Sequence, residues 1–431
     1  MAADLQGPSI GEVVSLVRGN TYKSALLGYD GPVLLGLGTI QRNGGFRADS
    51  LKTYGGESAD RLLLRPGDLY VSLKDVTQSA DLLGAIARLP DSISLGRLTQ
   101  DTVKLDFTGA SYPRSLLYWA LRSPQYRAFC REHATGTTNL GLAREDFLGY
   151  RLPAPSSDTL SLAEVLEAIE TRIEVLHQTN ATLEAIAQAL FKSWFVDFDP
   201  VRAKAEGREP EGMDPTTAAL FPSEFEDSEL GPIPRGWAVA SFEAEFDFTM
   251  GQSPPGSTYN ADRRGSPFFQ GCTDFGDVFP VERVFTSAPS RFARAGDVLM
   301  SVRAPVGTLN LAADDCAIGR GLCAIRHKSG STGLTFEFVK ASVNRIEAAA
   351  GEGALFKSLS KRQLADLRVA SAPDALVTAA IGLLDPIVER RLLLARQAER
   401  LAQLRDTLLP RLISGKLRIP DAEREIEATT A

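Results

Sequence analysis

The sequence has few of the residues that build disulfide frameworks and metal centres, with 4 Cys and 3 His among 431 residues. The cysteines are too few and too scattered to form a disulfide framework, which indicates a reducing compartment. No uninterrupted apolar run approaches the roughly 18–20 residues that a membrane span needs. The first residues also lack the basic start and apolar stretch of a secretory signal. We therefore expect a cytoplasmic protein.

Motifs for catalysis are also missing. No GxxxxGK[ST] loop occurs, which argues against a P-loop ATPase, and Gly36–Gln41 lacks the third glycine of a dinucleotide fingerprint. Ser253–Gly256 (SPPG) resembles a methyltransferase NPPY loop only superficially, because it has neither the leading Asn or Asp nor the final aromatic residue. Cys316, Cys323 and His327 supply only three ligands at an unusual spacing, so buried structural roles are expected. We expect no catalytic residue and no metal site in this chain.

The composition predicts a folded chain of several domains. Hydrophobic residues make up 44% and charged residues 23%, and the length suggests about two to four domains. The net charge of −7 is concentrated in one segment: residues 156–231 carry 5 basic and 16 acidic side chains. The blocks on either side, 1–155 and 232–372, are close to neutral. Most basic residues are Arg, which suits guanine edges and phosphates but also accompanies GC-rich coding sequence.

The chain is expected to contain an internal duplication. Arg65–Asp75 (RPGDLYVSLKD) and Arg294–Pro305 (RAGDVLMSVRAP) both consist of a turn followed by an apolar strand. Downstream, Ala134–Pro155 and Gly351–Pro373 both show a Gly-rich loop, a short helix and a strand that ends at proline. The two downstream segments are separated by fewer residues than the two turn-and-strand segments. The two copies therefore differ in internal loop length.

A long helix with a heptad pattern follows each copy. The first has apolar residues at alternating spacings of four and three from Leu162 to Trp194, with Asn180 in the pattern. The second repeats it from Ala380 to Leu412, interrupted by Arg391 and Arg405. We expect the two helices to pack on each other, the polar residues of one facing those of the other; an ordinary helix bundle is the alternative.

Several stretches resemble conserved regions of the specificity subunit of type I restriction–modification enzymes. They are Leu190–Gly207 (LFKSWFVDFDPVRAKAEG), Leu220–Trp237 and Leu408–Leu417. Gly251–Asn260 with Gly265–Asp277 looks like the start of a target recognition domain of that family, and Arg18–Ser24 looks like another subtype. The resemblance covers nearly the whole chain, in the order of the family.

The resemblance implies an α+β fold in which two mixed α/β target recognition domains are separated by two long antiparallel coiled-coil-like helices, with a pseudo-twofold internal repeat. The implied boundaries are 1–155 for the first recognition domain, 156–199 for the first long helix, 200–231 for a linker, 232–372 for the second recognition domain, 373–417 for the second long helix and 418–431 for a tail.

The resemblance also implies a function in defence against foreign DNA. Each domain would read one half of a bipartite, asymmetric target on double-stranded DNA, in the cytoplasm of a bacterium or archaeon. Two modification subunits would bring S-adenosylmethionine for DNA methylation, restriction subunits would use ATP with Mg²⁺, and the chain itself would hold no cofactor. A modification-only or related defence system is one alternative, and a scaffold without a DNA role is another.

Polar and basic loop residues near the repeated strands are the candidate DNA contacts, because phosphate contacts set register and base-edge contacts read sequence. In the first copy they are Thr21, Tyr22, Lys23, Ser24, Lys74, Asp75, Thr77, Thr137, Thr138 and Asn139. In the second copy they are Gln252, Ser253, Tyr259, Arg263, Arg264, Gln270, Arg303, Lys357, Ser358 and Lys361. An aromatic cluster of Trp194, Phe195 and Phe198 either packs in a domain junction or binds a partner subunit.

Overall fold

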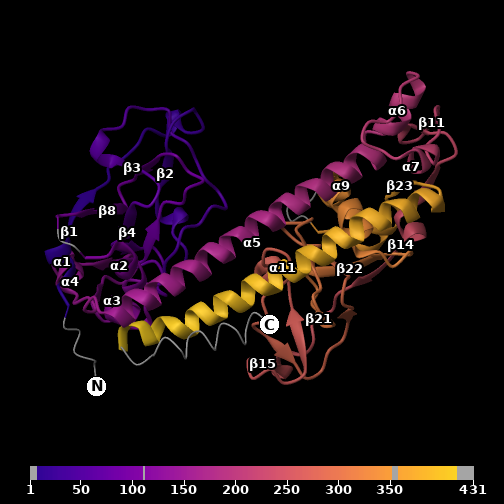
Figure 1. Cartoon of the computed structure of the whole chain (residues 1–431). Coiled ribbons are helices and arrows are strands. Elements are labelled where there is room, and N and C mark those ends of the chain that lie inside the picture. The colour runs from indigo at the N-terminus through magenta and orange to yellow at the C-terminus, as the bar shows by residue number, and fades with distance from the viewer. Residues whose placement is uncertain (1–6, 110–111, 352–357, 415–431) are drawn as a thin grey trace. The chain divides into compact units, whose positions relative to one another are not determined.

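The computed structural model describes residues 7–109, 112–351 and 358–414 (Figure 1). The chain divides into two compact units: unit 1 comprises Met1–Glu174 and Glu399–Ala431, and unit 2 comprises Val175–Ala398. Each unit therefore contains one globular domain and a part of each of two long helices. In the part of the chain that the structure describes, no helix is both long and apolar enough to span a lipid bilayer.

Unit 1 is built on a four-stranded antiparallel sheet. Its order is β1 (Val14–Arg18), β8 (Thr102–Phe107), β4 (Leu69–Ser72) and β6 (Ile86–Arg88). In a second sheet, β7 (Gly96–Leu98) pairs in parallel with β2 (Val33–Leu35) and antiparallel with β3 (Leu63–Leu64). A third sheet contains β5 (Lys74–Asp75), β10 (Leu140–Leu142) and β9 (Ala134–Thr135). The short helices of this domain are α1 (Ile10–Val13), α2 (Arg114–Ala120), α3 (Pro124–Glu132) and α4 (Arg144–Gly149).

Unit 2 repeats this strand order. Its four-stranded antiparallel sheet contains β14 (Phe246–Met250), β22 (Leu322–His327), β19 (Val298–Ser301) and β20 (Leu309–Leu311). In its second sheet, β21 (Cys316–Ile318) pairs in parallel with β16 (Ser266–Phe269) and antiparallel with β18 (Phe292–Ala293). β17 (Phe285–Thr286) and β15 (Tyr259–Asn260) extend that sheet. The same parallel and antiparallel partners thus surround β7 and β21.

One backbone contact occurs at the equivalent place in both units. The amide of Leu142 donates to the carbonyl of Leu73 at 3.0 Å, and the amide of Leu359 donates to the carbonyl of Val302 at 2.9 Å. Leu73 and Val302 occupy the same position in the two copies of the first repeated motif, and Leu142 and Leu359 do so in the second. The two repeated motifs therefore meet each other inside each unit.

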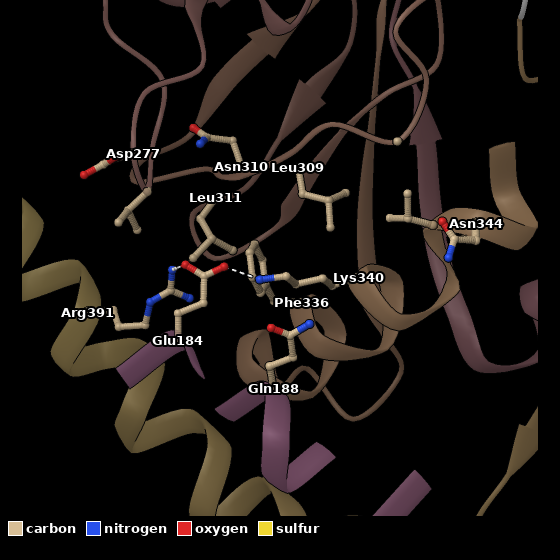
Figure 2. Close-up of a pocket in the computed structure, with 13 residues that line it drawn as sticks. Glu184, Gln188, Asp277, Leu309, Asn310, Leu311, Phe336, Lys340, Asn344 and Arg391 are labelled. Carbon is tan, nitrogen blue, oxygen red and sulfur yellow. Dashed lines mark hydrogen bonds and ion pairs between the residues drawn. The ribbon is translucent and has the colours of Figure 1, made fainter. Parts of the chain in front are cut away.

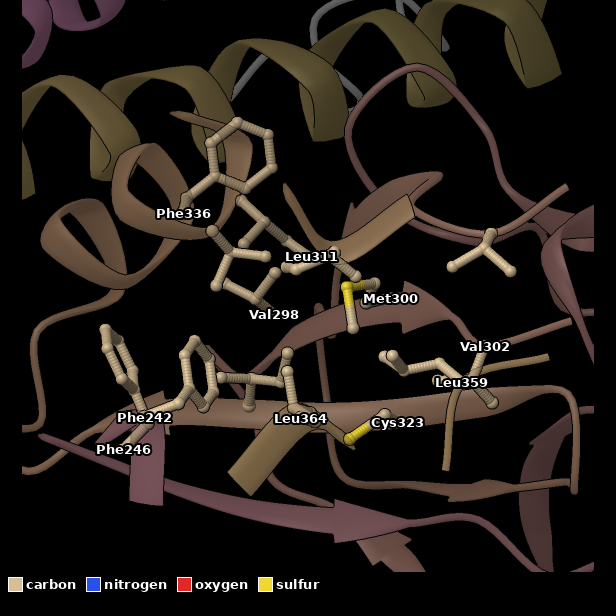
Figure 3. Close-up of a cluster of buried hydrophobic side chains, with 14 of the residues drawn as sticks. Phe242, Phe246, Val298, Met300, Val302, Leu311, Cys323, Phe336, Leu359 and Leu364 are labelled. Carbon is tan, nitrogen blue, oxygen red and sulfur yellow. The ribbon is translucent and has the colours of Figure 1, made fainter. Parts of the chain in front are cut away.

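One central strand of each four-stranded sheet, β4 in unit 1 and β19 in unit 2, is buried on both faces. All four residues of β19 are buried, and Val298 and Met300 lie in a cluster with Phe242 and Phe246 (Figure 3). The two phenylalanine rings stack with centroids 4.3 Å apart. Helices α8 (Phe242–Glu245), α9 (Thr332–Gly351) and α10 (Lys361–Ala365) contribute to this core, and β13 (Ala238–Ser241) pairs with β23 (Arg368–Ser371) beside it.

The long helices are α5 (Ser157–Phe195) and α11 (Asp374–Ser414). The first was expected to span 156–199, so it begins about where expected and ends four residues earlier. Within the expected seams, most apolar positions are buried, and so are Asn180 and Arg391. Val388 is buried and Ile387 only half-buried, so the seam of α11 shifts by one position there. Residues 415–417 of the expected second helix, and the expected tail, lie outside the described residues.

The segment expected as a linker, 200–231, is folded. It contains α6 (Asp199–Ala205) and α7 (Pro215–Ala219), and then β11 (Phe225–Ser228) pairs with β12 (Gly231–Pro234). Phe221 packs edge-on against Trp194 in an apolar cluster that also includes the buried Trp237. The sequence indicates a linker that packs only partly, through an apolar anchor at Leu220 and Phe221. The packing extends further, because a few aromatic residues are enough to fix a short segment that is otherwise polar.

A matched pair of substitutions tests the position of the unit 2 core. Phe246 is 1% exposed and Phe292 is 49% exposed. Because Phe246→Ala opens a cavity in a close-packed core, we expect it to lower the free energy of unfolding by about 3–5 kcal/mol. Phe292→Ala should change it by less than about 1 kcal/mol. Calorimetric unfolding checks both values, and equal effects would contradict the packing described here.

Candidate nucleic-acid interface

The loop Thr21–Ser24 follows β1 in unit 1, and all four of its side chains are exposed. A buried residue of β7, Arg97, holds the start of this loop. Its Nη2 donates to Asn20 Oδ1 at 2.7 Å and to the carbonyl of Thr21 at 3.2 Å. The loop is therefore fixed at its base while its side chains stay available to a ligand.

Arg97 is only 2% exposed, and its other contacts are made within the domain. Its Nε donates to Ser58 Oγ at 2.9 Å, and its guanidinium lies 4.8 Å from the centre of the Tyr54 ring. Tyr22 meets the same ring edge-on, with centroids 6.1 Å apart. Sequence reasoning missed Arg97, because an Arg in a short strand gives no signal of the partners that allow its burial.

Two other groups of candidates in unit 1 lie side by side. β5 carries Lys74 and pairs with β10, so the Lys74–Thr77 segment lies beside the hairpin turn that holds Thr137, Thr138 and Asn139. All three turn residues are exposed. Lys74 forms a weak surface ion pair with Asp101 at 3.5 Å.

Asp75 has a structural position within this group. Its side chain is buried, and its Oδ1 accepts hydrogen bonds from the amide and hydroxyl of Thr77 at 2.7 and 2.8 Å. Its Oδ2 accepts from the amide of Leu82 at 2.7 Å. The expectation that Asp75 offers its carboxylate to DNA does not fit this burial. The carboxylate instead holds the 76–82 loop through these hydrogen bonds.

The same pairing brings candidates together in unit 2. Arg303 and Ser358 form an isolated antiparallel bridge, and both side chains are exposed. Lys361 is the first residue of α10 and is also exposed. Lys357 lies outside the described residues. Arg303 and Ser358 thus occupy the place that Lys74 and the β9–β10 hairpin occupy in unit 1.

A second group in unit 2 surrounds the turn between β21 and β22. The amide of Arg320 lies 3.3 Å from Ser253 Oγ, and the amide of Gly321 donates to the carbonyl of Gln270 at 3.1 Å. A Cβ on Gly319 would lie 2.9 Å from the Cα of Gln270, so the approach requires glycine. Gln252, Gln270 and Arg320 are exposed around this turn. Arg320 was not among the expected contacts.

The remaining candidates of unit 2 already have partners in the chain. Tyr259 donates from its hydroxyl to the carbonyl of Pro254 at 3.0 Å and packs on Phe268. Arg263 pairs with Glu282, and Arg264 pairs with Asp262 at 3.1 Å. Exposed ion pairs of this kind contribute little, so the two arginines can exchange their carboxylates for phosphates at small cost.

The aromatic cluster at the end of α5 is mostly covered by the chain. Trp194 and Phe198 are buried, and Phe195 is half-buried. Phe198 meets Trp237 edge-on with centroids 5.4 Å apart, and Phe195 lies 5.7 Å from the same ring. The partly exposed Phe195 is the member most available to another subunit.

The cysteines of unit 2 are placed for packing. Burial raises the pKa of Cys316 to about 12, so its thiol stays protonated near neutral pH. Cys323 is fully buried on β22, in the cluster of Figure 3. Among the residues that the structure describes, no three His, Cys, Asp or Glu side chains are grouped as metal ligands would be.

Known proteins of one kind resemble this chain. No protein-family model matches it. It is 27% identical over 316 residues to the putative type I restriction enzyme MjaX specificity subunit of Methanocaldococcus jannaschii. The aligned region covers 71% of this chain and 68% of that protein. This chain is also 23% identical over 315 residues to the type I restriction enzyme HindI specificity subunit of Haemophilus influenzae, covering 62% and 69%.

The fold leads to the same class. The structure of a type I restriction–modification S subunit from M. genitalium superposes with a TM-score of 0.57 at 15% identity, covering 94% of this chain and 95% of the other. The chain is thus a homologue of type I specificity subunits and has their mixed α/β fold. Both relatives are named as specificity subunits of type I restriction enzymes, which confirms the resemblance found in the sequence.

Replacement of Arg97 tests whether it holds the Thr21–Ser24 loop. Arg97→Met keeps the apolar stem but removes the charged hydrogen bonds, each worth ~1.5–3 kcal/mol. We expect the amides of this loop to exchange with deuterium at least about tenfold faster, while the amides of unit 2 stay unchanged. Arg61→Met, at an exposed position, serves as the control. Unchanged exchange in the Arg97 variant would contradict the role assigned to it.

Proposed function

We propose that this chain is the specificity subunit of a type I restriction–modification complex and that each unit reads one half of a bipartite, asymmetric DNA target. The observation that carries the proposal is the repeated domain. The same four-stranded sheet occurs in each unit, and exposed polar loops follow equivalent strands. Two similar frameworks with different loops suit two half-sites of different sequence.

Catalysis in this proposal comes from other subunits. Two modification subunits bind the specificity chain and supply S-adenosylmethionine and the methyltransferase site. Restriction subunits supply ATP-dependent translocation and cleavage. The acidic segment 156–231 has 16 carboxylates, and those that are exposed face a protein partner rather than the phosphates of DNA. Glu170 and Glu184 instead pair with basic side chains of this chain. The half-buried Phe195 is the aromatic residue proposed to contact a modification subunit.

The two long helices are proposed to pair antiparallel, under pseudo-twofold symmetry, and to set the distance between half-sites. A helix with the 39 residues of α5 is about 58 Å long at 1.5 Å per residue. Half-sites read from one side of DNA repeat every ~34–36 Å. Helices of this length are long enough to hold two recognition domains a helical turn or more apart.

Deletion of one heptad from each helix tests this spacing role. Removing Val175–Ala181 together with Leu394–Arg400 shortens both helices by about 10 Å while keeping an antiparallel register. We expect the assembled methyltransferase to prefer a target whose spacer is about two to three base pairs shorter, with both half-sites unchanged. Methylation of a library of spacer lengths measures this. An unchanged preferred spacer length would show that the helices do not set the distance between half-sites.

Substitutions in the two units are expected to affect different half-sites. Lys74→Ala should weaken selection of one half-site, and Arg303→Ala that of the other, by roughly tenfold each, since one good contact to a base contributes ~1–3 kcal/mol. Binding of the assembled complex to duplexes with one scrambled half-site distinguishes the effects. If both variants bind all duplexes as the wild type does across a range of salt, these residues are not contacts.

A modification-only or related defence system would use the same chain in the same way, and the neighbouring genes distinguish it from a restriction system. The class of function is tested by comparing the methylomes of host cells with and without this gene. Loss of one bipartite motif supports the proposal. An unchanged methylome, with no sequence-selective binding by the assembled complex, would favour a scaffold without a DNA role.

A further inference from the structure

In unit 1, one carboxylate of α5 is held between two arginines. Glu170 Oε2 lies 2.8 Å from Nη1 of Arg405 on α11, and Glu170 Oε1 lies 2.9 Å from Nη1 of Arg122, which follows α2 in the globular domain. Burial disfavours ionisation of Glu170, but the charges of both arginines outweigh it and lower the pKa of this carboxyl. Glu170 therefore joins three elements as a charged group.

In unit 2, Glu184 of α5 has the equivalent arrangement (Figure 2). Its Oε2 lies 2.6 Å from Nη2 of Arg391 on α11, and its Oε1 pairs with Lys340 of α9 in the globular domain. Arg391 is 2% exposed, and its guanidinium lies 5.4 Å from the centre of the Phe336 ring. The carboxylate again joins α5, a seam arginine of α11 and a base from the recognition domain.

The two networks share one antiparallel register. Along α5, Glu184 follows Glu170 by two full heptads, and along α11, Arg391 precedes Arg405 by the same interval. Because the interval is a whole number of heptads, each ion pair recurs on the same face of its helix. A slip of either helix by one heptad would leave a buried arginine opposite no carboxylate.

Buried charges between two helices mainly select one register of the pair and add little to its stability. An apolar replacement of a buried ion pair is often neutral or stabilising, whereas a broken pair costs about 3–5 kcal/mol. The unit 2 network also borders a cavity of about 440 Å³ whose lining mixes apolar side chains with polar ones, among them Gln188, Asn310 and Asn344 (Figure 2). Apolar contacts, such as that of Val388 with the cluster around Phe336, also join α11 to the domain. The charged groups add a specific pairing to this apolar contact.

We propose that Glu170 and Glu184 are positioning residues. They fix the register of α5 against α11 and the position of each recognition domain on the helices. The complex is thereby limited to targets of one spacer length. This inference rests on the proposed function, because it concerns how sharply that function selects its target. The positioning role differs from the spacing role of the helices. Helix length sets the mean spacer length of the target, and the ion pairs set how narrowly that length is selected.

The test replaces each network by apolar side chains. The first variant is Glu170→Leu, Arg405→Leu and Arg122→Met, the second is Glu184→Leu, Arg391→Leu and Lys340→Met, and a third combines them. Apolar replacement keeps volume in the seam, so we expect thermal stability near that of the wild type. We expect the ratio of methylation on the preferred spacer to that on spacers one base pair longer or shorter to fall at least about tenfold.

Control variants separate positioning from folding. Arg396 of α11 pairs with Asp314 of the same unit at 3.5 Å on the surface, and Arg396→Gln with Asp314→Asn should leave the ratio unchanged. If an apolar variant fails to fold, the double variant Glu170→Gln, Glu184→Gln replaces it and should show the same loss of selectivity.

The outcomes are distinguishable from failure of the proposed function. A wild-type complex without preference for any bipartite target would overturn the proposed function. A wild-type complex with a sharp spacer preference, together with folded variants that keep it, would overturn only the positioning role of Glu170 and Glu184.

Discussion

The arrangement on which the rest of the molecule depends is a carboxylate of α5 held between an arginine of α11 and a basic side chain of the adjacent domain. It occurs once in each unit, through Glu170 and Glu184. An apolar seam alone permits neighbouring registers, because leucines spaced by heptads are interchangeable. Buried charges remove that freedom, since each must find its partner or remain desolvated and unpaired.

Within each domain, buried polar side chains also fix positions that apolar packing leaves undefined. The strands are anchored by apolar side chains, whereas buried polar residues define the shape of the loops between them. Arg97 fixes the base of the Thr21–Ser24 loop, and Asp75 fixes the 76–82 loop. The exposed side chains of these loops are therefore held by buried residues that solvent does not reach. This division lets one framework serve two domains with different surfaces.

Patterns that depend on periodicity were predictable from the sequence, and contacts that depend on distant partners were not. The two repeated motifs located the segments that meet in each unit, because turn glycines and apolar runs are local signals. Arg391 was visible as an interruption of the seam, but not its pairing with Glu184. Asp75 was expected at the surface, since nothing adjacent reveals the three donors that surround it. Residues 200–231 were interpreted as a partly packed linker with an anchor at Leu220 and Phe221, because proline, glycine and acidic residues outnumber the apolar ones. Their helices and hairpin were not foreseen.

The surface charges explain how a chain with a net charge of −7 can serve a DNA-reading function. Several candidate bases, among them Lys74, Arg263 and Arg264, already lie beside a carboxylate. Such pairs weaken the long-range field that attracts any DNA, yet they cost little to open when a phosphate takes the place of the carboxylate. Non-specific affinity falls more than specific affinity, because only the cognate sequence adds contacts to base edges. Low positive charge therefore favours discrimination, and in the proposed complex the attraction that this chain lacks comes from the other subunits.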